Sequence, residues 1–335
     1  MQHLDHITLI LYIILPIAAV ILIGFICRQL RCFPESFGPM LLKFSVIIGL
    51  PALLFFETAA IPPDEIENLP TYHFVGVFTA GMLLTFFLAM LFYWRCYRSD
   101  IAHSAIAALN ASMSNSALLA LPILVSLFGT RIMPLCVLCI VAVILIVFPV
   151  AELIIRISLS PQRSVIKIIK DLLCILWRLL RTPFILATSL GLALTLLRIP
   201  LPLPISKFSD SLGVTFVPCA LFAIGASLEL QSLRAVTTYL IPISLIKLVI
   251  QPAIMLALIR YTDLPAPYAI VALISASVPP AKASVALANQ YNMLYPEASM
   301  GTVVMTILSL LTVSAWILIA NALWPDYFLY HIAIS

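Results

Sequence analysis

Long apolar runs constrain this chain more than any other feature of its sequence. A helix that crosses a bilayer needs about 20 predominantly apolar residues. Ten stretches approach or reach that length, with approximate limits at residues 7–27, 39–58, 72–94, 101–128, 132–155, 182–198, 208–229, 236–259, 267–290 and 299–324. Hydrocarbon offers no hydrogen-bond partner to exposed backbone, so such spans are helical. The sequence therefore predicts an all-α polytopic membrane protein with ten transmembrane helices.

Composition supports this class and argues against several others. Only 10% of the 335 residues are charged and 63% are hydrophobic, against about 25% and 45–50% in soluble domains. The net charge of +4 is spread over loops, so no nucleic acid partner is expected. The histidines are scattered and the cysteines lie mostly in apolar runs, so no metal or cofactor is predicted. No nucleophile–base set or nucleotide-binding motif occurs, so we expect no enzyme.

The placement of Lys and Arg predicts the orientation of the chain. Two of the 18, Lys247 and Lys282, fall inside spans. One set of loops holds 12 of them, at positions 28, 31, 43, 95, 98, 156, 163, 167, 170, 178, 181 and 234, and the opposite set holds four, at 131, 198, 207 and 260. The richer side is expected to be cytoplasmic. We therefore predict an integral membrane protein with both termini on the outer side.

Two of the ten spans are interrupted by polar residues and proline. The fourth span carries Ser112, Ser114, Asn115, Ser116 and Pro122, and the ninth carries Pro279, Pro280, Lys282 and Ser284. Polar groups at membrane depth must find partners inside the protein, so both stretches are predicted to be locally unwound. Interrupted spans at corresponding places in two halves of a chain indicate a transporter's binding site.

Prolines also predict that the second half of the chain repeats the first. Three pairs occur in the same order, with offsets of 167, 167 and 158 residues: Pro16 and Pro183, Pro51 and Pro218, Pro122 and Pro280. Because five spans is an odd number, the second copy enters from the opposite side and the repeat is inverted. We expect two five-helix repeats at 1–155 and 182–335, joined by a linker at 156–181.

The linker at 156–181 is basic and carries apolar residues at near-helical spacing. This pattern is typical of a helix that lies at the cytoplasmic interface on anionic lipid. A regulatory or partner-binding helix is the alternative.

The interrupted spans predict a binding site near mid-membrane. Asn115 lies about 14 residues from the expected cytoplasmic entry, or roughly 21 Å deep. If the two spans cross there, the half-helices direct free N–H groups and positive dipole ends toward an anion. Asn115 suits a carboxylate or amide, unless it and its neighbouring serines only tie up backbone freed by Pro122. The substrate candidates are Ser114, Asn115, Ser116, Pro122, Pro279, Pro280, Lys282 and Ser284.

The two intramembrane lysines receive different interpretations. A charge at this depth is costly unless it is paired or wet, so it is a functional candidate by default. Lys282 is expected to attract the anion, to carry a proton, or to stand in for a coupling sodium ion. The alternatives are that it reaches to the cytoplasm or pairs with a carboxylate. For Lys247, followed by Gln251 and Pro252, structural pairing is the preferred interpretation.

Four segments resemble the auxin efflux carrier family of secondary transporters, which includes plant auxin carriers and bacterial organic-acid carriers. They are NSALLALPILVSLFG at 115–129, TPFILATSLGLALTLLRIPLPLP at 182–204, PCALFAIGASL at 218–228 and PPAKASVALANQY at 279–291. The chain departs from the family where Ala120 replaces a usual glycine. It departs again where Ala283, next to Lys282, aligns with an asparagine common in bacterial relatives.

The resemblance implies two inverted five-helix repeats with crossed, broken helices 4 and 9, a fold shared with sodium–bile acid symporters. Spans one, two, six and seven would form a scaffold, and the others a transport part. It implies small organic anion substrates such as auxin, malate and malonate, and a homodimer through the scaffold. A uniport or proton-linked mode is preferred over sodium coupling. A channel-like pore, a non-transporting sensor and a sodium-coupled symporter are the competing functions.

Overall fold

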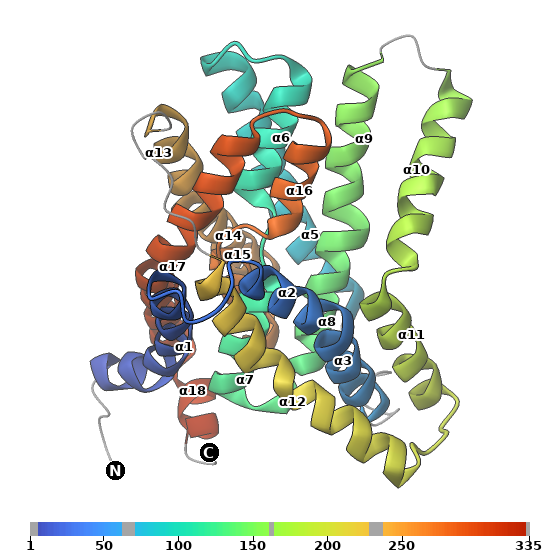
Figure 1. Cartoon of the computed structure of the whole chain (residues 1–335), viewed down its shortest axis with the longest axis vertical. Helices are drawn as coiled ribbons and strands as arrows, with labels where there is room; N and C mark the ends of the chain where they lie inside the picture. Colours follow the sequence, from blue (N-terminus) through green and yellow to red (C-terminus); the bar gives the residue numbers. More distant parts are fainter. Residues whose placement is uncertain (1–5, 62–70, 161–163, 228–236, 333–335) are drawn as a thin grey trace. The chain divides into compact units, whose positions relative to one another are not determined.

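The computed structural model describes residues 6–61, 71–160, 164–227 and 237–332, and within them the chain is all helical (Figure 1). An isolated antiparallel bridge is the one β-type pairing in these ranges. The predicted helical class is confirmed. Arg163 and Arg234, which the orientation prediction used, lie outside the described residues.

Six described helices are long and apolar enough to cross a membrane. They are Phe37–Ala59, Thr71–Cys96, Met133–Ser158, Leu203–Ala226, Tyr239–Thr262 and Tyr295–Leu323. A seventh span results if α10 (Val165–Leu180) and α11 (Pro183–Leu196), bent by 72° at their junction, are counted together. Shorter apolar helices at Leu15–Gln29, Ser116–Phe128 and Ala266–Ser277 fall in the first, fourth and ninth predicted spans. The protein is therefore an integral membrane protein, while the ten-span count stays a prediction.

The chain divides into two compact units, each built from several separate segments. Unit 1 combines residues 1–71, 121–137 and 178–228. Its helical elements are α1 (His6–Gln29), α2 (Phe37–Phe44), η1 (Ser45–Gly49), α3 (Leu50–Ala59), α7 (Leu121–Phe128), η3 (Thr130–Ile132), α11 and α12 (Leu203–Ala226), with the start of α8 (Met133–Ala142). Unit 1 thus holds spans one, two, six and seven, the set that the family resemblance assigns to a scaffold.

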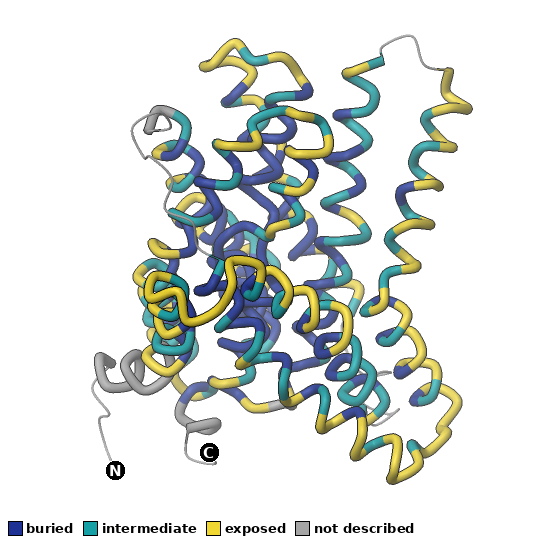
Figure 2. The backbone as a smooth tube through the Cα atoms, in the orientation of Figure 1, coloured by how far each residue is buried: buried dark blue, intermediate teal, exposed yellow. Residues whose placement is uncertain are grey.

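Unit 2 combines residues 72–120, 138–177 and 229–335. Its elements are α5 (Thr71–Cys96), α6 (Ile101–Ser112), η2 (Ser116–Ala120), the end of α8, η4 (Val143–Val147), α9 (Phe148–Ser158), most of α10, α13 (Thr237–Leu245), η6 (Ile246–Ile250), α14 (Gln251–Thr262), α15 (Ala266–Ser277), α16 (Lys282–Gln290), α17 (Tyr295–Leu323) and α18 (Pro325–Ile332). In Figure 2, α6 and α15 are almost continuously buried. These two half-helices form the centre of unit 2.

Prolines shape four of the spans in the same way. The segments η1, η2, η4 and η6 are π-helical turns, and each ends two residues before a proline, at Pro51, Pro122, Pro149 and Pro252. Proline lacks an N–H and its ring crowds the carbonyl four residues earlier. The preceding turn therefore widens to i→i+5 bonding, a local distortion common at functional sites. Two of these turns, η2 and η6, carry candidate residues.

A glycine lets α1 and α12 pack closely inside unit 1. A Cβ on Gly24 would overlap the carbonyl oxygen of Phe222 and lie 3.0 Å from the backbone nitrogen of Ala226. Lipid gives membrane helices no hydrophobic drive to associate, so they rely on small residues that let two backbones come close.

A second glycine plays the same part between α11 and α3. A Cβ on Gly191 would overlap the Thr58 hydroxyl and lie 2.7 Å from the carbonyl oxygen of Phe55 and 3.2 Å from the backbone nitrogen of Ala59. Both glycines therefore sit over a Phe carbonyl and an Ala amide, four residues apart on the partner helix.

Candidate functional site

The two interrupted spans meet within unit 2. Ser114 and Pro280 form an antiparallel bridge, whose two backbone hydrogen bonds run from Asn115 N to Pro279 O (2.9 Å) and from Ala281 N to Met113 O (3.2 Å). The extended backbone at each break is thus satisfied by the other break, as hydrocarbon requires. The two interrupted stretches thus lie against each other.

The bridge does not involve the proline that the predicted repeat matches with Pro280. Pro122 lies in α7, beyond the break, and Ser114 is the residue that faces Pro280. Their separation, 280 − 114 = 166, is close to the offset of 167 between the other two proline pairs. The repeat itself stays a prediction.

Asn115 opens the second half of the first broken span. Its Oδ1 accepts a hydrogen bond from the backbone N–H of Leu118 at 3.3 Å, as a helix N-cap does. The side chain is buried, with 8% of its surface exposed. The buried Ser116 hydroxyl has no hydrogen-bond partner among the described residues. A helix start with a buried, unused hydroxyl offers donors to an anionic group.

Lys282 and Ser284 begin α16, the second half of the other broken span. The side chain of Lys282 is exposed, whereas Ser284 is buried. The Ser284 hydroxyl donates to Asn110 Oδ1 at 3.1 Å, and the Thr302 hydroxyl donates to the same oxygen at 3.3 Å. Asn110 Nδ2 donates to the carbonyl of Ala298 at 3.3 Å. Asn110, which the sequence did not single out, therefore ties the start of α16 to α6 and α17.

Lys247 is the buried cation of this region. Its side chain is fully buried, and its Nζ donates to Ser114 Oγ at 2.7 Å, to the carbonyl of Ala276 at 3.2 Å and to Gln251 Oε1. No carboxylate in the described part of the chain forms an ion pair with it. Lys247 is thus hydrogen-bonded to neutral oxygens near the bridge and forms no ion pair with an acid of the described residues.

Gln251 links Lys247 to the first half-helix. Its Nε2 donates to the carbonyl of Ser112, the last residue of α6, at 2.6 Å. The two side chains are one turn apart, and the widened η6 turn ahead of Pro252 places both toward the bridge. The ammonium group therefore lies where α6 and α15 end, and a cation is favoured at helix C-termini.

The electrostatics of the crossing are divided between its two sides. The C-terminal ends of α6 and α15 carry the negative dipole ends, which Lys247 and Gln251 satisfy. The second halves, which start at η2 and α16, begin after the bridge with positive dipole ends. Asn115 and Ser116 lie at the first of these N-terminal ends, and Lys282 lies at the second.

Comparison with known proteins agrees with this architecture. The sequence profile of a family described as "Membrane transport protein" matches residues 9–317. The chain belongs to this family. It is the auxin efflux carrier family predicted from the sequence. A relative from Rhizobium meliloti (strain 1021), described as "Putative malonate transporter", is 26% identical over 329 residues, covering 94% of this chain and 98% of the relative.

Sequence reasoning missed part of the site for a physical reason. Gln251 was noted beside Lys247 without a role, and Asn110 was not weighed at all. The available signal for Lys247 and Gln251 was their spacing of four residues, with a proline directly after the glutamine. Asn110 lies in an apolar half-helix five residues before Asn115, and only tertiary packing reveals its partners.

Proposed function

We propose that this protein is a secondary transporter that moves small organic anions by alternating access, and that dicarboxylates such as malonate are among its substrates. The substrate class draws on the relative described as a malonate transporter. The single observation that carries the proposal is the bridge of Ser114 and Pro280, which sets the breaks of the two interrupted spans against each other, with the buried Lys247 hydrogen-bonded to Ser114.

The proposed site binds one carboxylate at the N-terminal side of the bridge. Asn115 and Ser116 donate from the first broken span, and backbone N–H groups at the start of α16 donate from the second. Lys282 sits at the start of α16 with an exposed side chain, so it can reach a second carboxylate of the same molecule. Pro122, Pro279, Pro280 and Ser284 act indirectly, since they shape or anchor the backbone that carries the donors.

The proposed mechanism needs no bound sodium ion. Lys247 already places a cation at the C-terminal ends of α6 and α15, where a coupling ion would otherwise neutralise the helix ends. The sequence interpretation gives this role to Lys282, and we assign it instead to Lys247 because Lys247 is buried. A uniport mode or a mode with proton exchange on Lys247 is favoured over sodium symport.

Two inverted five-helix repeats give alternating access its structural basis. Adding 167 to Gly24 gives Gly191, and the same offset relates their contacts: Phe55 to Phe222 and Ala59 to Ala226. Equivalent glycines over equivalent carbonyls are what a two-fold relation between repeats produces. We propose ten spans in an inner membrane, with both termini outside and a homodimer formed through unit 1.

Counterflow in proteoliposomes tests the proposed function. Vesicles loaded with unlabelled malonate should accumulate radiolabelled malonate in a saturable way, and an aromatic monocarboxylate serves as the second substrate class. We expect Asn115→Ala and Lys282→Ala to reduce malonate exchange, and Lys207→Ala, an exposed lysine of unit 1, to leave it unchanged.

The competing functions give different results in the same vesicles. Non-saturable flux without counterflow indicates a channel-like pore, and binding without flux indicates a sensor. Exchange that requires an inward sodium gradient would overturn the sodium-independent mechanism. No exchange of either substrate class would refute the organic-anion assignment.

A further inference from the structure

The helix α10 combines an apolar stripe with a basic edge. On a helical wheel its residues divide into three faces. One side faces the protein, and Ile175 is its fully buried residue. Next to it lies an exposed apolar stripe of Ile166, Ile169, Leu173, Trp177 and Leu180, whose side chains are 42–66% exposed. The third face carries Lys167, Lys170 and Arg178. An exposed apolar stripe bordered by cations is typical of helices at a lipid surface.

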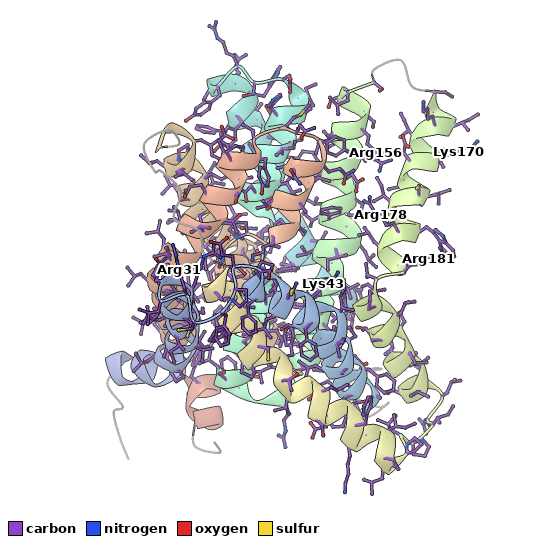
Figure 3. The ribbon with its side chains drawn as sticks, in the orientation of Figure 1. Arg31, Lys43, Arg156, Lys170, Arg178 and Arg181 are labelled. Carbon is purple, nitrogen blue, oxygen red and sulfur yellow. The ribbon has the colours of Figure 1, made fainter. Side chains whose placement is uncertain are left out.

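An ion-pair network fixes which face of α10 turns away from the protein. Arg156 near the end of α9 contacts Glu152 at 2.7 Å and Asp171 of α10 at 3.3 Å. Asp171 is the acid that lies at the edge of the protein-facing side of α10. In Figure 3, Arg156 lies between α9 and α10, and Lys170 lies on the side of α10 away from α9. This contact holds the lysines and the apolar stripe outward.

We propose that the outer surface of α10 binds anionic phospholipid, with Lys167 and Lys170 at the headgroups and the apolar stripe against the acyl chains. Basic residues occur at both ends of this 16-residue helix. Burying that many charges in hydrocarbon is unfavourable, so the basic edge is expected to lie where lipid headgroups can reach it. The stripe and the basic edge adjoin along its length, which fits the amphipathic shape of a phospholipid better than a wholly polar or wholly apolar partner.

The expected selectivity follows from the two lysines. A basic residue near an anionic surface contributes about 1 kcal/mol, or about fivefold in local lipid preference. Trp177 lies seven residues, or two helical turns, after Lys170, so it lies where the apolar stripe adjoins the basic edge, and its side chain, 58% exposed, reports lipid contact. The fluorescence of this residue is isolated as the difference between the wild-type protein and Trp177→Phe.

The experiment reconstitutes the full-length protein in vesicles that contain a minor fraction of one brominated lipid, either phosphatidylglycerol or phosphatidylcholine. We expect brominated phosphatidylglycerol to quench Trp177 several-fold more than the same fraction of brominated phosphatidylcholine. The excess should be lost in Lys167→Gln/Lys170→Gln. It should persist in Arg131→Gln/Lys207→Gln, which removes two exposed charges from unit 1. Circular dichroism verifies that each variant keeps its helix content.

Three results would overturn the proposal. Equal quenching by both lipids would mean that the stripe contacts acyl chains without headgroup recognition. No quenching by either lipid would mean that protein covers this face, as a second copy or a partner would. An excess that persists in the Lys167→Gln/Lys170→Gln variant would remove the two lysines as its cause.

Discussion

The most direct test of the crossing is Lys247→Met, which keeps side-chain length and removes the charge. Lys247 Nζ lies 2.7 Å from Ser114 Oγ, and Asn115 is the next residue. Consecutive Cα atoms are about 3.8 Å apart, and with the reach of the Asn115 side chain we take a separation on the order of 8 Å between Nζ and an anion held by Asn115. At an effective dielectric constant of about 20, the lost attraction is about 2 kcal/mol. We therefore expect malonate affinity to fall roughly 30-fold.

The assay is the concentration dependence of malonate counterflow, paired with direct binding of labelled malonate to purified protein. Lys207→Met is the matched control, because it removes one exposed charge from unit 1. Lys247→Arg keeps the charge and should retain most of the affinity. Thermal melting in detergent separates lost affinity from lost folding. A folded Lys247→Met protein with unchanged malonate affinity would refute the electrostatic role of this residue.

Three further variants test a close helix contact of unit 1, a buried hydrogen-bond centre of unit 2 and a helix cap. Gly191→Leu should lower stability by about 1–3 kcal/mol or more, whereas Gly76→Leu, where a Cβ meets nothing within 4 Å, should melt like the wild type. Asn110→Ala should lower the free energy of unfolding by about 1–3 kcal/mol, because it leaves the buried groups that bond Asn110 without a hydrogen-bond partner. It should also slow transport more than Ser284→Ala. Asp100 caps α6, and the hydrogen bond from the backbone N–H three residues later lowers the pKa of its carboxyl. Its stabilisation should therefore be present at neutral pH and be lost as the pH falls through that lowered pKa. Asp100→Ala, which should cost about 1 kcal/mol, should remove this pH dependence from melting curves.

The sequence predicted the crossing because its causes are local. Polar residues and proline in an apolar span leave few conformations that satisfy the backbone in hydrocarbon. Two such spans in one chain can satisfy each other's backbone groups. The two breaks follow from this reasoning, whereas the family rests on the resemblance of four segments. The exact register did not follow from this reasoning, since the unwound residues 113–115 precede Pro122 by seven positions or more. In this chain Pro122 widens the helical turn directly before it, and the helix is interrupted at the polar residues that precede that turn.

The roles of the two lysines could not be settled from the sequence, because depth along a span does not determine burial. Lys282 and Lys247 both lie inside predicted membrane spans. A lysine at the start of a half-helix projects from the crossing, and the side chain of Lys282 is exposed. A lysine inside a π-helical turn is rotated relative to the rest of its helix, and η6 turns Lys247 inward. The decisive factor is Pro252, five residues further along the same span.

The arrangement of Lys247 and Gln251 explains how a crossing can operate without a bound metal ion. Two helices that stop inside a membrane protein leave carbonyl groups at their C-termini, and these need positive charge or hydrogen-bond donors. An ion that fills this role binds and leaves with the transport cycle, which couples its gradient to the substrate. A covalently attached ammonium group cannot leave, so it removes that coupling while keeping the helix ends satisfied. The proposed mode with proton exchange on Lys247 gives this residue a second role, which Lys247→Met would remove as well. Replacing Lys247 with Met should therefore lower the affinity for malonate and also weaken any dependence of malonate exchange on a pH gradient. If only the affinity falls, Lys247 acts through its charge alone. If only the pH dependence is lost, Lys247 acts in proton transfer alone.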